Sequence, residues 1–80
     1  MNNEIGYSKA QWYITARIEM SKEEDGLLWK TTKHIPDFLV SEAQYGILSG
    51  VGACDVARRI IDPLGTIGTN LIIRAQMVTF

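Results

Sequence analysis

The sequence is poor in the side chains that carry most protein chemistry. Its 80 residues include one cysteine, Cys54, and one histidine, His34. A lone cysteine excludes a disulfide within the chain, and one cysteine with one histidine is too few for a zinc site of the usual composition. A catalytic centre needs several converging groups. We therefore expect a non-enzymatic protein without a metal or other cofactor.

The sequence also lacks a long apolar run and an excess of either charge. No stretch approaches the roughly 20 apolar residues that span a bilayer, and no signal peptide is evident. Eight Lys and Arg against nine Asp and Glu give a net charge of −1, which argues against sequence-independent binding of nucleic acid. The hydrophobic content of 46% is typical of a globular domain. We expect a cytoplasmic, single-domain protein that does not contact membranes.

Glycine is concentrated in one stretch, GILSGVG, at residues 46–52. A dinucleotide-binding loop would need a third glycine where Asp55 stands, and a phosphate-binding P-loop would need a glycine followed by Lys and then Ser or Thr. Neither pattern is present, so we expect no nucleotide cofactor. Each glycine inside a helix costs roughly 1 kcal/mol relative to alanine. The glycines therefore predict a helix that is kinked or interrupted near residues 50–52, or one that packs closely against another backbone.

Alternation of apolar and polar residues predicts two strands in the first half. Residues 11–20 alternate strictly, which is typical of a strand with one buried face. The charged stretch 21–26 predicts a hairpin connection, and residues 27–40 form the second strand. Pro36 cannot donate to a sheet hydrogen bond, so it places this strand at an edge or at a bulge. We expect Trp29 to close one end of the core.

A helical region and a third strand are expected in the second half. Ser41, with Gln44 three residues later, is a capping signature, and the helical region runs from there to residue 64. Residues 70–80 alternate again and predict the last strand. One apolar stripe along the helix is expected to face the core: Ala43, Ile47, Val51, Cys54, Ala57, Ile61 and Leu64.

This order of elements, ββαβ, predicts an α+β two-layer sandwich. We expect a three-stranded antiparallel sheet of order 2-1-3, with one kinked or interrupted helix on one face. Residues 1–10 are expected to be a flexible N-terminal arm and residues 11–80 the single domain. The helix is expected to cover the face lined by Trp12, Ile14, Ala16, Ile18, Leu71, Ile73 and Met77.

The opposite, outer sheet face is the main candidate for function. It combines polar side chains with apolar ones near the last strand, a composition often found at interfaces. We expect a small interaction protein that contacts itself, as a homo-oligomer, or a larger protein assembly. Its size suits a modulator or inhibitor of the kind that compact viral or mobile-element genomes encode. The candidate interface residues, including two arginines on the helix, are Tyr13, Arg17, Arg58, Arg59, Ile72, Arg74, Val78 and Phe80.

Two alternative functions come from other classes. Tyr13 with Arg17, Arg74 and Lys30 on an open sheet could bind single-stranded nucleic acid, because such binders stack bases on aromatic side chains beside basic groups. The chain could also be a small ligand-binding domain or a minimal enzyme. Salt-dependent binding of an oligonucleotide would favour the first alternative, whereas one stoichiometric protein partner would favour the interaction protein.

Overall fold

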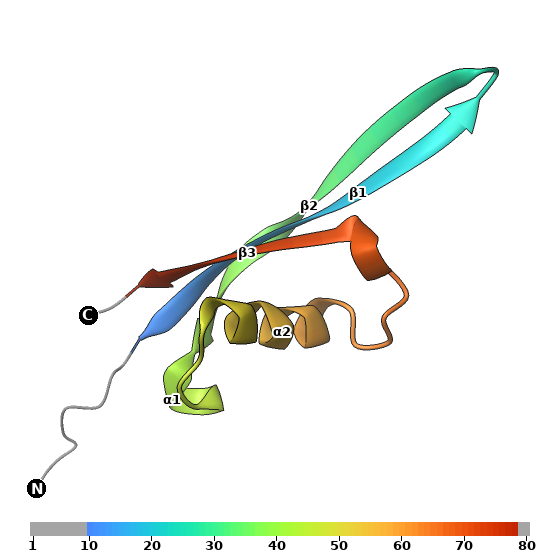
Figure 1. The fold of residues 1–80 in the computed structure, drawn as a ribbon. Coiled ribbons are helices and arrows are strands. Elements are labelled where there is room, and N and C mark those ends of the chain that lie inside the picture. The colour runs from blue at the N-terminus through green and yellow to red at the C-terminus, as the bar shows by residue number, and fades with distance from the viewer. Residues whose placement is uncertain (1–9, 79–80) are drawn as a thin grey trace, which may run out of the picture.

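The computed structural model, described for residues 10–78, has a three-stranded sheet with helices packed on one face (Figure 1). The ββαβ order of the main elements and the α+β class agree with the sequence prediction. The elements are β1 (Gln11–Glu24), β2 (Leu27–Ser41), α1 (Glu42–Tyr45), α2 (Gly50–Ile61), the single 3-10 turn η1 (Gly68–Asn70) and β3 (Leu71–Val78).

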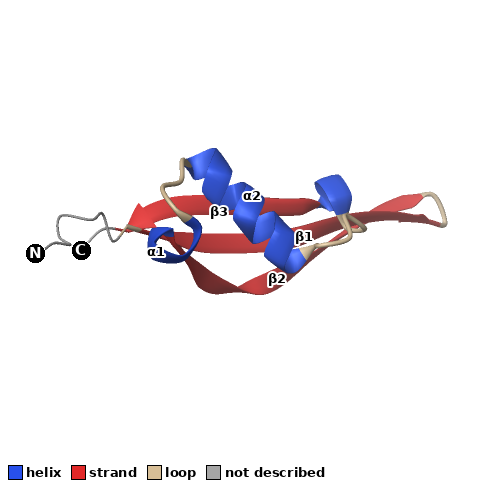
Figure 2. Ribbon diagram, turned by 90° about the horizontal axis from the view of Figure 1, so that it is seen from below, coloured by secondary structure: helices blue, strands red, loops and turns tan. Residues whose placement is uncertain are grey.

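The sheet is antiparallel and has the order β2-β1-β3, as predicted. The central strand β1 pairs with β3 from Gln11, opposite Val78, to Ile18, opposite Leu71. α2 lies along one face of this part of the sheet (Figure 2). Among residues 10–78, no helix has both the length and the apolar character needed to cross a membrane.

The core lies between α2 and the paired region of the sheet. Ile14 on β1 is completely buried, and Ala53 and Ala57 on α2 are buried with it. Because alanine side chains are short, the helix axis can approach the sheet closely at these two positions. The buried cluster as a whole contains Trp12, Ile14, Val40, Ala53, Val56 and Ala57.

A bulge in β2 surrounds Pro36, as the position of this proline predicts. Ile14 pairs with Phe38, but Ala16 pairs with Ile35, so β2 has one residue more than β1 between these two pairs. The extra residue restores the inward orientation of the strand after the proline, and Phe38 packs against the core. The two predictions for Pro36, an edge strand and a bulge, are both confirmed.

The helical region is interrupted, as predicted, but the break lies at residues 46–49 and not near residues 50–52, which form the first turn of α2. Gly46 ends α1 with a φ of +87°, a conformation that favours glycine, and its N–H donates to the Glu42 carbonyl at 2.8 Å. Ser49 then begins α2 by accepting a hydrogen bond from the Gly52 N–H at 3.0 Å. Gly46 is therefore explained by its backbone conformation, and a side chain built there would meet no atom within 4 Å.

The predicted single apolar stripe along the helical region is wrong in part. Ile47, Val51 and Leu64 were expected to face the core, but they are 91%, 75% and 86% exposed. The break and the end of α2 at residue 61 explain the difference, because the break changes the rotational phase of the second helix. In that phase α2 buries Ala53 and Val56 instead.

The hairpin between the first two strands also differs from the prediction. The connection is a two-residue turn, Asp25–Gly26, with φ values of 54° and 78°, and not the whole stretch 21–26. Both φ values are positive, as in the turns that join two strands most tightly.

Trp29 does not close the core: it is 54% exposed, because it lies beyond the end of β3. Met77, also expected in the core, is 48% exposed.

Candidate interaction surface

A two-stranded ribbon projects from the sheet (Figure 1). The pairing of β3 with β1 ends at Ile18, whereas β1 and β2 stay paired as far as Glu24 and Leu27. Residues 19–32, here called the projecting hairpin, therefore pair only with each other among the strands of the described chain. Every residue from Glu19 to His34 is exposed. The core of the domain thus gives the projecting hairpin little support.

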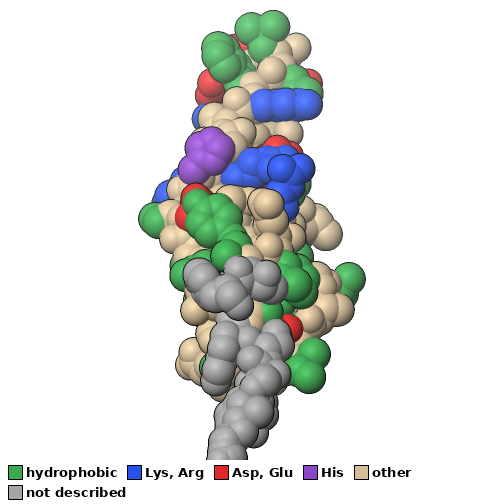
Figure 3. Space-filling model, turned by 90° about the vertical axis from the view of Figure 1, so that its left-hand side faces the viewer, with side chains coloured by type: hydrophobic (Ala, Val, Ile, Leu, Met, Phe, Trp, Pro, Cys, Tyr) green, Lys and Arg blue, Asp and Glu red, His purple; other side chains and the backbone are tan. Residues whose placement is uncertain are grey.

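The projecting hairpin carries large apolar side chains in solvent. Met20, Leu27, Leu28 and Trp29 are 46%, 59%, 65% and 54% exposed. A lone two-stranded ribbon is only marginally stable in water, because it has no hydrophobic face buried against another layer. Hydrophobic side chains gather at the far end of the molecule in the space-filling view (Figure 3). Such a cluster on a ribbon is typical of a contact surface.

The projecting hairpin has more acidic than basic side chains. Residues 19–32 contain four carboxylates and two lysines. One of these lysines, Lys22, forms an ion pair with Glu24 at 3.4 Å, and both side chains are exposed. Further basic residues, Lys33 and His34, follow toward the body of the domain. The tip is therefore apolar and acidic, which does not favour the phosphate backbone of nucleic acids.

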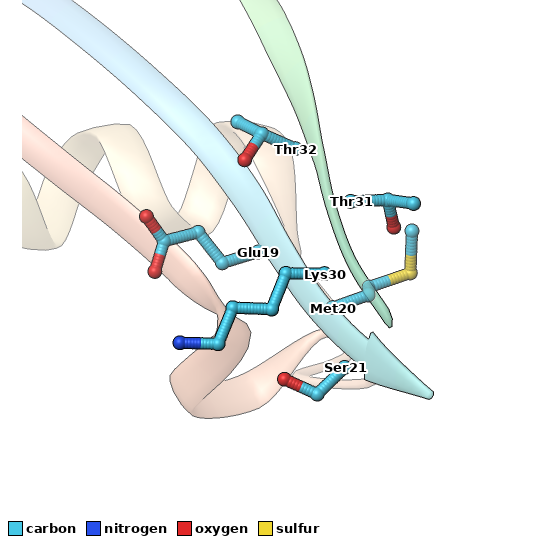
Figure 4. Close-up of a pocket in the computed structure, with 6 residues that line it drawn as sticks. All are labelled: Glu19, Met20, Ser21, Lys30, Thr31 and Thr32. Carbon is cyan, nitrogen blue, oxygen red and sulfur yellow. The ribbon is translucent and has the colours of Figure 1, made fainter. Parts of the chain in front are cut away.

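A shallow pocket of about 200 Å³ lies at the middle of the projecting hairpin (Figure 4). Glu19 and Lys30 extend to one side of the ribbon, whereas Met20 and Thr31 extend to the other (Figure 4). The polar groups do not converge on one point, so the pocket offers no pair of nucleophile and base. Its lining residues are Glu19, Met20, Ser21, Lys30, Thr31 and Thr32.

Two of the predicted interface residues on β1 have partners within the chain. The Tyr13 hydroxyl donates to the Asp37 carboxylate across the β2 bulge. This hydrogen bond raises the pKa of Tyr13, with smaller contributions from burial and from the charge of Asp37. Arg17 forms an ion pair with Glu19, with 2.7 Å between Nε and Oε2. Both side chains lie on the outer face, but binding a ligand through them would compete with these contacts.

The predicted interface residues on β3 also lie on the outer face. Ile72 is opposite Arg17 on β1, and both it and Val78 are half-buried. Arg74 is exposed. Phe80 lies outside the described residues. β3 is the second edge of the sheet, so its outer side can still meet another chain.

The two arginines on α2 have different surroundings. Arg58 is half-buried and donates to the main-chain carbonyls of Gly68 at 3.1 Å and Leu71 at 2.9 Å. It thereby holds the loop after α2 against the start of β3. Arg59 is exposed, so of the two it is the one whose side chain faces solvent.

Asp62 organises the same loop from the end of α2. Its carboxylate accepts hydrogen bonds from the N–H groups of Ile67 at 3.0 Å and Gly68 at 3.1 Å, and from the Thr66 hydroxyl at 3.4 Å. Burial raises the pKa of Asp62, but these donors outweigh it and hold the pKa below its usual value. The carboxylate is therefore a structural acceptor in its charged form.

The two rare side chains lie apart. Cys54 is a free cysteine, half-buried on α2, and its thiol points to the Ile73 carbonyl at 3.9 Å. His34 is exposed on β2, opposite Arg17. Within the part of the chain that the structure describes, no three residues of the types His, Cys, Asp and Glu are grouped so as to hold a metal ion.

The projecting hairpin is the surface that sequence reasoning missed. Two signals pointed to it: Asp25–Gly26 is a strong two-residue turn signal, and the next three residues, Leu27 to Trp29, are all apolar. No family model, no curated protein and no solved structure matches this chain.

Proposed function

We propose that this chain is a non-enzymatic interaction protein that docks its projecting hairpin on another protein surface, either a second copy or a larger assembly. The observation that carries the proposal is the exposure of Leu27, Leu28 and Trp29 on a ribbon that extends beyond the sheet and helix. Because these side chains contribute little to the domain core, their apolar character is explained best by a contact with another chain.

The energetic case rests on what a partner would cover. Burial of one large apolar side chain is worth about 1.5 to 3 kcal/mol. Tryptophan is prominent among the residues that dominate binding energy at interfaces. Trp29 shares one face of the exposed end with Leu27, and Leu28 lies on the other face. A partner that covers these three side chains would also immobilise a ribbon that is only marginally stable alone.

The cytoplasm is the compartment we propose for this interaction. Cys54 is a free thiol, and a chain without a disulfide fits a reducing environment. An oligomer or a stable heterologous complex would also compensate for the small core that a chain of this length can build.

Affinity capture with matched variants tests the proposal. Tagged wild-type protein should retain one stoichiometric protein partner, or untagged copies of itself, from an extract of its source. Trp29→Ser on the projecting hairpin should abolish this retention, whereas Leu64→Ser, which removes an even more exposed apolar side chain just after α2, should leave it intact. Equal retention by Trp29→Ser and wild type would overturn the proposal.

Binding of single-stranded nucleic acid is the alternative with some support. Tyr13, Arg17 and Arg74 share the outer sheet face. However, Tyr13 and Arg17 already engage Asp37 and Glu19 within the chain, and this reduces the support. Fluorescence anisotropy with a labelled oligonucleotide should show no salt-dependent binding; a clear decrease in affinity with rising salt would favour the alternative.

A ligand-binding domain or minimal enzyme is the third candidate. Among residues 10–78 its structural support is the shallow pocket on the projecting hairpin, whose polar side chains point to different sides of the ribbon. Saturable binding of a small molecule that is lost in Lys30→Ala would favour it.

A further inference from the structure

We propose that two copies of this chain pair through their β2 strands, antiparallel and with Thr31 facing Thr31 of the second copy, to form one continuous six-stranded sheet. This inference rests on the proposed function and names the first partner of the projecting hairpin. It follows from three features of β2: its free edge, the length of the segment that can pair, and the side chains that this length brings together.

The first feature is the free edge of β2. Among the strands of residues 10–78, the order β2-β1-β3 leaves β2 paired on one side only. The two residues that flank a two-residue turn exchange main-chain hydrogen bonds with each other, so Leu27 is hydrogen-bonded to Glu24. In an antiparallel pair this bonding recurs at every second residue, so the main-chain groups of Trp29, Thr31 and Lys33 also point toward β1. The alternate residues therefore direct their N–H and C=O groups to the free edge. They are Leu28, Lys30, Thr32 and His34.

The second feature is the length of the segment that can pair. It begins at Leu27, directly after the turn, and ends at Ile35, because the bulge at Pro36 interrupts the regular edge. Two antiparallel copies use the whole segment only if its central residue, Thr31, lies on the two-fold axis. In this register Leu28 faces His34 of the second copy. All outward-directed groups then find partners, giving about eight main-chain hydrogen bonds.

The third feature is the set of side-chain pairs in this register. Leu27 would face Ile35 of the second copy, Trp29 would face Lys33, and Lys30 would face Thr32. The first pair is apolar, and the second brings a lysine to the aromatic ring. No two side chains of like charge lie directly opposite each other. If the second copy were shifted by two residues in one direction, Lys30 would face Lys30 of that copy. If it were shifted by two residues in the other direction, Lys30 would face His34 of that copy.

The rows of side chains across the new sheet support the same register. On the helix-covered face, Ala16 lies beside Ile35 within one chain. Leu27 of the second copy would continue this row and extend the apolar end of the core. On the outer face, Glu19 lies beside Thr32 within one chain, and Lys30 of the second copy would lie on the other side of Thr32. The exposed tip of one copy is thus covered along its edge by the body of the other.

A cysteine cross-link tests the register directly. In a Cys54→Ser background, Thr31→Cys places two cysteines face to face across the axis, at a pair without main-chain hydrogen bonds, where side chains approach most closely. Mild oxidation should convert this variant to a covalent dimer. Lys33→Cys is the matched control, because its two cysteines would lie roughly 13 Å apart along the strand. Equal cross-linking of both variants would overturn the register.

Sedimentation equilibrium tests the pairing itself. Wild-type protein should reach twice the chain mass as its concentration rises. Thr31→Lys should remain a monomer with an unchanged circular dichroism spectrum, because it places two lysines on the axis at a site that is exposed in the single chain. Gln76→Lys on the other edge strand, also exposed, should still dimerise.

Two results would contradict the pairing. The first is a wild-type protein that stays monomeric at every concentration. The second is a dimer that is lost in the Gln76→Lys variant but still forms in the Thr31→Lys variant. If the monomer still captured a protein partner and lost it in Trp29→Ser, only the pairing would fail and the proposed function would stand.

Discussion

Ile18 pairs with Leu71, and this pair marks the boundary between two parts of the molecule that differ in stabilisation. Leu71 is 2% exposed at the edge of the packed body. Beyond Ile18, β1 pairs with β2 alone, and every residue from Glu19 onward to the turn is exposed. The packing contacts that stabilise the fold therefore lie between α2 and the three-stranded part of the sheet. The projecting hairpin is available for contact with other chains.

The two tryptophans should differ sharply in their contribution to stability. Trp12 is 7% exposed in the core, and Trp12→Ala should cost about 3 to 5 kcal/mol of unfolding free energy. Trp29 is 54% exposed, and Trp29→Ser should change the unfolding free energy by less than about 0.5 kcal/mol. Urea titration at low protein concentration, where self-association is weak, measures both. A large loss in Trp29→Ser would show that the projecting hairpin is part of the core.

The central strand should tolerate change on its outer face only. Ile14 is completely buried, so Ile14→Ala should destabilise the fold by about 2 to 5 kcal/mol. Arg17 is exposed and forms a surface ion pair with Glu19, so Arg17→Ala should cost less than about 1 kcal/mol. Denaturant titration of both variants checks this difference. Equal losses would mean that the faces of β1 are assigned the wrong way round.

The glycines near the helix break should respond in opposite directions to alanine. Gly46 has a φ of +87° and a ψ of 179°, a region that essentially only glycine occupies, so Gly46→Ala should cost about 1 to 3 kcal/mol. Gly50 lies at the start of α2, and a Cβ there would be 3.8 Å from the Trp12 ring, an ordinary contact. Gly50→Ala should therefore stabilise the protein by up to about 1 kcal/mol. Thermal melts of the pair provide the comparison, and the opposite order would disprove this explanation of the break.

Stability should fall in acid partly through Asp62. Its pKa is lower in the folded chain than in the unfolded chain, where it is about 3.9. The charged form therefore contributes stability above pH 4, and this contribution disappears as the pH falls through the folded-state pKa. Asp62→Asn should be less stable than wild type at pH 7, and the gap should narrow toward pH 2. Urea titrations across this pH range measure the gap; a constant gap would exclude the carboxylate as the cause.

The sheet could be predicted from the sequence because its signal is local. Residues 11–20 alternate strictly, and burial on one face of a central strand requires that alternation. Pro36 likewise indicated its own position, since a missing N–H is tolerated only at an edge or a bulge. Trp29 also lies on the same side of β2 as Ile35, as the even spacing between them implies.

The errors arose where burial depends on distant residues. Whether Trp29 is covered depends on the length of β3, which is more than 40 positions away in the sequence. Val51 was assigned to the buried stripe because the same phase was used from Ala43 to Leu64, and the break at residues 46–49 changed that phase. Alternation and helical spacing define faces, but they do not define which other element covers them.

Amide hydrogen exchange along β2, recorded at increasing protein concentration, is the most direct measurement of whether the projecting hairpin is the contact surface. The amides of Leu28, Lys30, Thr32 and His34 point away from β1, so they should exchange rapidly in the single chain. We predict that all four become protected as the concentration rises or a protein partner is added, while the buried amide of Ile14 is unaffected. Rapid exchange at all four positions under every condition, with protection appearing instead along β3, would contradict this function of the hairpin.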